Sequence, residues 1–144
     1  MKYAKIENNQ ITQVIETFHQ DENLTDDYRV LSAEFDTIQP GVIVSEYYWD
    51  DDQPALKPER PSSYHFWNWS AKSWDVDTTE LFTQMRYLRT QKLYASDWTQ
   101  VADSSLSEEQ KTAWRTYRQS LRDFVTNNSD ATDLDSLVWP TEPS

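Results

Sequence analysis

The sequence predicts an α+β chain with a β-rich N-terminal half and a helical C-terminal module. Apolar and polar residues alternate near the N-terminus, prolines and acids interrupt the middle of the chain, and apolar residues later recur at helical spacing. We expect residues 1–49 to form the β-rich region, residues 50–63 a linker, and residues 64–144 an aromatic β-hairpin with an antiparallel pair of helices.

The β-rich region begins with a predicted hairpin. Residues 3–7 alternate in polarity, and the Asn8-Asn9 pair tolerates the positive φ angles of a tight turn. Two shorter β-like runs follow at residues 28–31 and 42–49. The next stretch carries three prolines and a run of acids, so we expect an extended linker that is partly polyproline in character.

Two capping patterns predict where the helices of the last part begin. Asp77 is followed three positions later by Glu80, and Ser107 is followed in the same way by Gln110. Apolar residues recur on one face after each pattern, and the first helix is expected to run to about residue 95. The aromatic stretch before the first helix favours a hairpin.

A small apolar core is expected to hold the helical pair together. Trp114 and Tyr117 should face the first helix near Leu88, while Trp98 and Trp139 close the two ends of the pair. The complete predicted core of the module is Leu88, Trp98, Trp114, Tyr117, Leu121 and Trp139.

The composition excludes several classes of function. The 144 residues include 13 basic and 25 acidic ones, so the formal net charge is −12 and the chain should repel nucleic acid. Gly41 is the single glycine, whereas phosphate-binding loops need several. There is no cysteine and no apolar run long enough to span a membrane.

A catalytic or metal site is not predicted. His19 and His65 are the two histidines, and they lack the spacing of metal ligands on a helix. The acids Asp50, Asp51 and Asp52 point in different directions, and no glycine gives them the tight turn of a calcium loop. No pair of carboxylates stands out among the 25 acids, so we expect neither an enzyme nor a cofactor.

Two groups of residues are candidates for binding another protein. Aromatic residues occupy both faces of the predicted hairpin, so they either fill its buried face or meet a surface outside this chain. The aromatic candidates are Trp49, Trp67, Trp69 and Trp74. A stripe of arginines beside the apolar face of the second helix either pairs with acids of neighbouring segments or docks an acidic surface. The basic candidates are Arg115, Arg118 and Arg122.

A series of motifs follows in order between Arg86 and Pro143. They are Ser96-Asp97-Trp98-Thr99-Gln100, the acidic cap Ser107-Glu108-Glu109-Gln110, the helix motif Trp114-x-x-Tyr117-Arg118-x-x-Leu121-Arg122-Asp123, and the closing Trp139-Pro140. In these motifs the chain resembles the tail assembly chaperone family of tailed bacteriophages. The loop after the helix motif departs from the family, which carries proline and phenylalanine there, and this departure leaves the end of the second helix undefined.

The resemblance implies a small non-catalytic phage protein that binds a tail or tail fibre protein and aids its folding or assembly in the host cell cytoplasm. The linker, the Trp-rich hairpin and residues 2–9 also resemble segments that precede this module in tail fibre and tail fibre assembly proteins. The alternative is a structural component of the virion tail, at a fibre tip or baseplate, that binds host-surface glycans through exposed aromatic residues. A homo-oligomer is compatible with either function.

Overall fold

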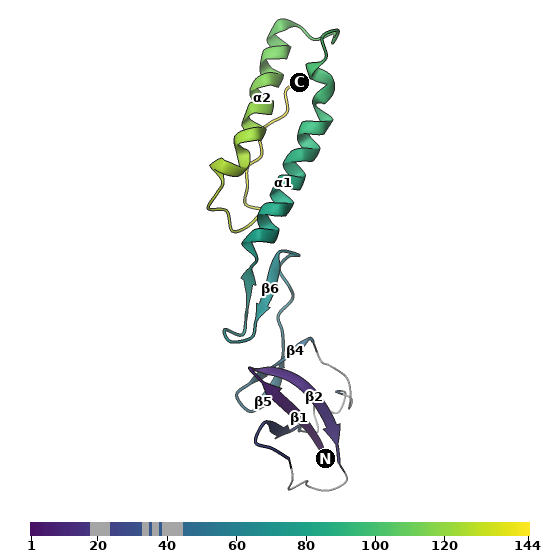
Figure 1. The fold of residues 1–144 in the computed structure, drawn as a ribbon, viewed down its shortest axis with the longest axis vertical. Coiled ribbons are helices and arrows are strands. Elements are labelled where there is room, and N and C mark those ends of the chain that lie inside the picture. Colours follow the sequence, from purple (N-terminus) through teal and green to yellow (C-terminus); the bar gives the residue numbers. More distant parts are fainter. Residues whose placement is uncertain (18–23, 33–34, 36–37, 39–44) are drawn as a thin grey trace. The chain divides into compact units, whose positions relative to one another are not determined.

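The protein has an α+β fold, as the sequence predicts. The computed structural model describes residues 1–17, 24–32, 35, 38 and 45–144. Strands form the N-terminal half, and two long helices follow them (Figure 1). The chain divides into two compact units, Met1–Asp75 and Val76–Ser144. This division assigns the aromatic hairpin to the first unit, whereas the sequence grouped it with the helices.

A three-stranded antiparallel sheet begins the first unit. Strand β1 (Lys2–Glu7) lies between β2 (Gln10–Glu16) and β3 (Tyr28–Val30). The turn between β1 and β2 is made by Asn8 and Asn9, whose φ angles are 50° and 62°. The predicted N-terminal hairpin is therefore confirmed, together with the reason for its two asparagines.

A register shift between β1 and β2 lets residues three positions apart in β2 share the core face of the first unit. Ala4 of β1 and the apolar pair Ile11 and Val14 of β2 are fully buried, and Trp49 packs into the same cluster. Residues 42–44 of the predicted strand at 42–49 lie outside the described residues. The same holds for two residues singled out in the sequence, His19 and Gly41.

A second hairpin occupies part of the predicted linker. Strand β4 (Tyr47–Asp50) pairs with β5 (Gln53–Leu56), so the expected linker over residues 50–63 is wrong for residues 50–56. Pro54 lies opposite Trp49, whose backbone N–H donates at 2.7 Å to the Asn9 carbonyl instead of to β5. A proline, which has no N–H to donate, is tolerated at such a place in an edge strand.

The predicted aromatic hairpin is confirmed. Strand β6 (His65–Asn68) and strand β7 (Ser73–Val76) form a two-stranded sheet. The Asn68 side chain holds the connecting turn, because its Oδ1 accepts from two backbone N–H groups at 3.0 and 3.1 Å. Its Nδ2 donates to Asp75 at 2.7 Å, and Lys72 supplies the positive φ of 53° that the turn needs.

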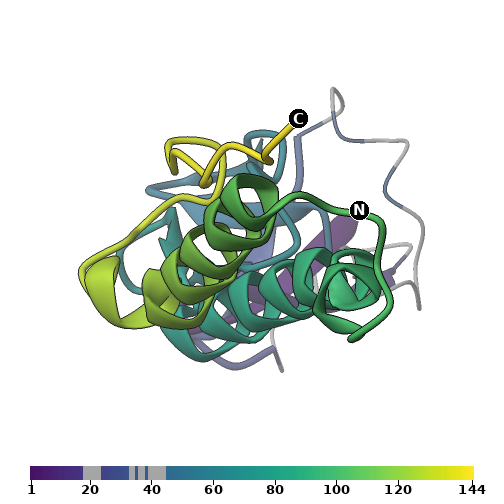
Figure 2. The ribbon, with the colours of Figure 1, turned by 90° about the horizontal axis from the view of Figure 1, so that it is seen from above.

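The second unit contains the two predicted helices, which run side by side in both ribbon views (Figures 1 and 2). Helix α1 (Thr78–Ala95) leads through the short 3₁₀-helix η2 (Asp97–Gln100) to α2 (Glu108–Asn127). The predicted capping box at Ser107 and Gln110 has both of its hydrogen bonds, at 3.0 and 3.2 Å.

Helix α1 begins with one of the two hydrogen bonds of its predicted capping box. Asp77 accepts from the Glu80 backbone N–H at 3.0 Å, whereas the Glu80 carboxylate accepts from the Gln84 side chain at 3.0 Å. Helix α2 ends at an Asn128 cap, whose backbone and side chain both donate to the Phe124 carbonyl, at 3.1 and 2.8 Å. This cap defines the helix end that the sequence left undefined.

The C-terminal segment returns along the helical pair without forming a helix or a strand (Figure 1). Trp139 stacks on Phe124 of α2 with ring centroids 3.9 Å apart and an interplanar angle of 15°. The Lys92 ammonium of α1 lies 5.5 Å from the Trp139 ring centroid. The segment is thus anchored to both helices through one aromatic ring.

Candidate partner-binding surface

The inner face of α2 carries three of the predicted core residues. Trp114, Tyr117 and Leu121 are buried and form one cluster with apolar residues of the neighbouring segments. Trp114 and Tyr117 meet edge to face, with ring centroids 5.6 Å apart. The partly buried residues packed on this cluster are Leu93, Leu106 and Trp139.

Two predicted core residues lie at the surface instead. Leu88 is 39% exposed, so its assignment to the core is wrong. The inner face of α1 follows Leu81 and Met85 in steps of four residues, and Leu88 lies one position off this row. Trp98 rests edge to face on Trp114 at 5.8 Å but is 54% exposed, so it covers the end of the cluster and still offers most of its surface.

Arg118 joins the end of α1 to the middle of α2. Its Nη1 donates to the Leu93 carbonyl and to the buried Ser96 hydroxyl, both at 2.7 Å. Its Nη2 donates to the Asp97 carboxylate at 2.8 Å. The guanidinium of Arg118 is buried, and these contacts hold it at the C-terminal, negative end of helix α1. Arg118 thus pairs with an acid of a neighbouring segment and is not available to a partner.

The other two arginines of the predicted stripe are exposed. Arg122 makes one long contact, at 3.5 Å, from its Nη1 to the Gln119 side chain. Arg115 forms no hydrogen bond or ion pair among the residues that the structure describes. The stripe therefore divides into a buried structural arginine and two arginines whose charged groups reach solvent.

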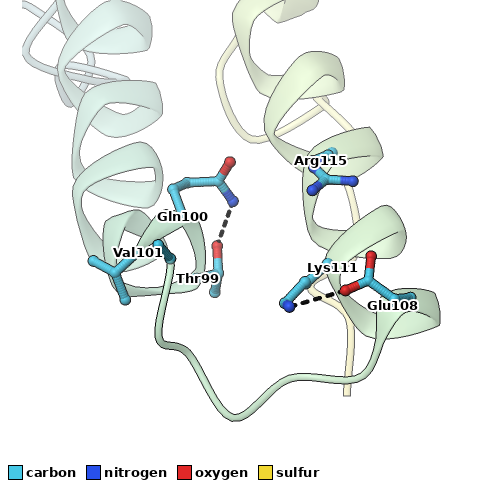
Figure 3. Close-up of a pocket in the computed structure, with 7 residues that line it drawn as sticks. Thr99, Gln100, Val101, Glu108, Lys111 and Arg115 are labelled. Carbon is cyan, nitrogen blue, oxygen red and sulfur yellow. Dashed lines mark hydrogen bonds and ion pairs between the residues drawn. The ribbon is translucent and has the colours of Figure 1, made fainter.

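A cleft of about 220 Å³ lies between η2 and the first turns of α2. Figure 3 shows Lys111 and Arg115 on α2, facing Thr99 and Gln100 across it. The Gln100 amide donates to the Thr99 hydroxyl at 2.7 Å, and the Lys111 ammonium contacts the Glu108 carboxylate at 3.0 Å. The cleft thus holds two cations and one acid, in a chain whose formal net charge is −12.

The electrostatics at the start of α2 follow from these contacts. The hydrogen bond from Lys111, together with its charge, lowers the pKa of Glu108. Hydrogen bonds from its own backbone N–H and from Ser107 lower the pKa of Glu109. Burial raises the pKa of the Tyr117 hydroxyl on the inner face. Both glutamates therefore stay charged at neutral pH, next to the positive end of the helix dipole.

Exposed apolar residues continue along α1 and η2. Tyr94 is 77% exposed, and Val101, which also lines the cleft, is 51% exposed. The complete set of these exposed residues is Tyr87, Leu88, Tyr94, Trp98 and Val101. Residues 81–96 contain three cations and no acid, so this part of α1 is locally basic within an acidic protein. A surface of this kind is typical of a protein-binding site.

Residues 82–144 match the family model described as phage tail assembly chaperone protein. The resemblance predicted from the motifs is therefore confirmed for this segment, and it supports a role in phage tail assembly. The matched segment is slightly less than half of the chain, and it contains η2, α2 and most of α1. Neither a curated protein nor a solved structure matches the chain.

The aromatic hairpin lies outside the segment that matches the tail assembly chaperone model. Trp67 is buried among rings of the first unit, 5.2 Å from the centroids of Tyr48 and Trp74 and 6.3 Å from Trp69. Trp49 is buried in the sheet core. These two tryptophans therefore fill buried faces, which is one of the two alternatives that the sequence left open.

The other two predicted tryptophans are half-buried. The Lys57 ammonium lies 3.9 Å from the Trp69 ring centroid, and the Trp74 indole N–H donates to the Pro58 carbonyl at 2.9 Å. Phe66 is exposed, so an aromatic residue does occupy the outer face of β6. Because the contacts of Trp69 and Trp74 are mostly internal, the exposed groups of the helical unit are the stronger binding candidates.

Within residues 1–17, 24–32, 35, 38 and 45–144, no three or more His, Asp or Glu side chains are grouped so as to hold a metal ion. None of the helices in these ranges is long and apolar enough to cross a bilayer. His65 pairs with the Ser62 hydroxyl at 2.7 Å.

Proposed function

We propose that this protein aids phage tail assembly by binding a tail or tail fibre protein, without catalysing a reaction. The match of residues 82–144 to the tail assembly chaperone model carries this proposal. We place the binding event in the host cell cytoplasm, where tail proteins are synthesised and assembled.

The physical properties of the chain support such a role. Tail proteins expose sheet edges and apolar interfaces before they oligomerise, and such surfaces aggregate unless they are covered. The helical unit offers exposed aromatic groups on a rigid pair of helices, which can cover part of an unassembled interface. The net charge of −12 keeps a complex of this kind in solution.

The alternative of a glycan-binding virion component has less support. It requires exposed aromatic residues, whereas two of the four candidate tryptophans, Trp49 and Trp67, are buried. The family match lies in the helical unit and not in the hairpin. We therefore favour an assembly function over an adhesive one.

Co-expression tests the proposed function. The full chain is expressed with each tail and tail fibre protein of the same phage, and the soluble, correctly oligomerised yield of that protein is measured by size-exclusion chromatography. We expect a higher yield for at least one tail protein, which also co-purifies with the chain. An unrelated acidic protein of similar size is the control for a general effect of charge. If no tail protein gains yield over this control, the proposed function is wrong.

A further inference from the structure

The proposed assembly function assigns no ligand to the cationic cleft between η2 and α2. We infer that this cleft binds the carboxylate of an acidic side chain in the tail partner, and that Arg115 is its main ligand. The inference rests on the proposed function, because it supposes a protein partner. It adds the position of the contact on this chain and the chemical class of the group that is bound.

Arg115 has the properties of a carboxylate ligand. Its guanidinium is exposed, lines the cleft and has no hydrogen-bond partner among the described residues. A guanidinium presents paired N–H donors that match the two oxygens of a carboxylate. Trp114, the preceding residue, is buried in the core cluster and fixes this part of α2. The donors of Arg115 are therefore carried by a rigid element, which lowers the entropy lost on binding.

Lys111 supplements Arg115 on the same side of α2. The two residues are four positions apart, so their side chains project from one helix face, as Figure 3 shows. Glu108 faces both cations, because it pairs with Lys111 and the charge of Arg115 also lowers its pKa. Two cations against one acid leave one positive charge, so the cleft as a whole favours one further anionic group.

The size and surroundings of the cleft favour a protein side chain over other anions. Its volume of about 220 Å³ is below the range of pockets that enclose a whole small-molecule ligand, yet it accommodates a carboxylate side chain. A nucleic acid would bring many phosphates against a chain of net charge −12. A single acidic residue adds little to this long-range repulsion.

Apolar groups beside the cleft indicate what should flank the acidic residue. Trp98 belongs to η2, and Val101 directly follows the last residue of that 3₁₀-helix. Both are more than half exposed, and Val101 also lines the cleft. The ring of Trp98 touches Trp114, which directly precedes Arg115 in the sequence. A partner segment with an apolar residue next to an acid would satisfy both features.

The partner test compares variants of the full chain in binding the tail protein that co-purifies with it. Arg115→Gln should weaken this binding about tenfold or more, because one charge-assisted contact is lost. Arg115→Lys should give an intermediate loss, since it keeps the charge but not the paired donors. Arg29→Gln removes the same charge from an exposed arginine of β3, outside the segment that matches the family model, so it is the matched control and should change binding by less than about twofold.

A second arm needs no partner protein. The full chain is titrated with the peptide acetyl-Leu-Glu-Leu-amide and with its glutamine counterpart, and side-chain NMR signals of Arg115 and Gln100 are followed. We expect the glutamate peptide to shift these signals and the glutamine peptide to leave them in place. If neither peptide shifts them, or if an oligonucleotide shifts them more strongly than the glutamate peptide, the inference is overturned.

The two arms separate the inference from the proposed function. If wild type and Arg115→Gln bind the tail protein equally, carboxylate binding by the cleft is refuted and the assembly function stands. If no tail protein binds the wild type, the assembly function fails, and the peptide titration still decides whether the cleft takes a carboxylate.

Discussion

Arg118 of α2 and Asp97 of η2 form an ion pair at 2.8 Å, although 21 positions separate them in the sequence. The same guanidinium donates to the Leu93 carbonyl in the last turn of α1. One side chain therefore donates to a backbone carbonyl at the end of the first helix and also fixes the start of the connection to the second helix. The cleft and the exposed Trp98 lie on this connection, so their geometry depends on Arg118.

Arg118→Ala should destabilise the helical unit by about 2 to 3 kcal/mol, because it removes charge-assisted hydrogen bonds and leaves the buried Ser96 hydroxyl without this donor. Urea denaturation of the full chain, followed by helical circular dichroism, measures the effect. Arg122→Ala, which removes an exposed arginine from the same helix, should cost under about 1 kcal/mol. Equal losses for the two variants would contradict a structural role for Arg118.

Trp114→Ala should cost about 3 to 5 kcal/mol, since it leaves a cavity in the core of the helical unit. This is a large part of the total stability of a small domain, so the unit should unfold or nearly unfold. Thermal melts of the full chain test this expectation, with Trp98→Ala as a milder comparison because Trp98 is half exposed. A harmless Trp114→Ala would show that the inner face of α2 is assigned incorrectly.

Trp139→Ala should release the C-terminal segment from the helices. The variant loses the stacking on Phe124, a contact worth about 0.5 to 1.5 kcal/mol beyond the area it buries. Digestion by carboxypeptidase should then remove the segment faster than in the wild type. The neighbouring Val138 is 89% exposed, so Val138→Ala is the matched control and should leave the digestion rate unchanged. Equal rates for all three proteins would argue against the anchor.

The start of α2 should lose stability in acid. Lys111 holds the pKa of Glu108 below its ordinary value, so the favourable contribution of Glu108 is complete above that ordinary value and is lost as the pH falls through the lowered pKa. Carboxyl NMR shifts of Glu108 against pH measure the lowered value. Lys111→Gln should raise the pKa of Glu108, and an unchanged value would contradict the pairing.

Local sequence signals predicted much of the helical unit. Ser107 and Gln110 mark the start of α2, and the spacing of Trp114, Tyr117 and Leu121 gives its inner face, because capping and helical periodicity act over a few residues. The turn at Asn8-Asn9 is local in the same sense. These features require no knowledge of distant parts of the chain.

Features that depend on distant contacts were not predicted. The β4–β5 hairpin accommodates Pro54 because the N–H of Trp49 bonds to Asn9, about 40 positions earlier. The sequence left open whether Arg118 pairs within the chain or docks a partner, and only the end of α1, which folds against it, decides this. Neither contact leaves a local pattern, and for the same reason the sequence kept the buried Trp67 among the candidates for partner binding.

Hydrogen exchange of the full chain, with and without the tail protein that co-purifies with it, tests most directly whether the helical unit binds a phage tail component. We predict that binding protects amides within residues 82–144, with the largest changes around the exposed groups of η2 and the first turns of α2. Protection confined to residues 1–75, or no change in exchange anywhere in the chain, would contradict this role for the helical unit.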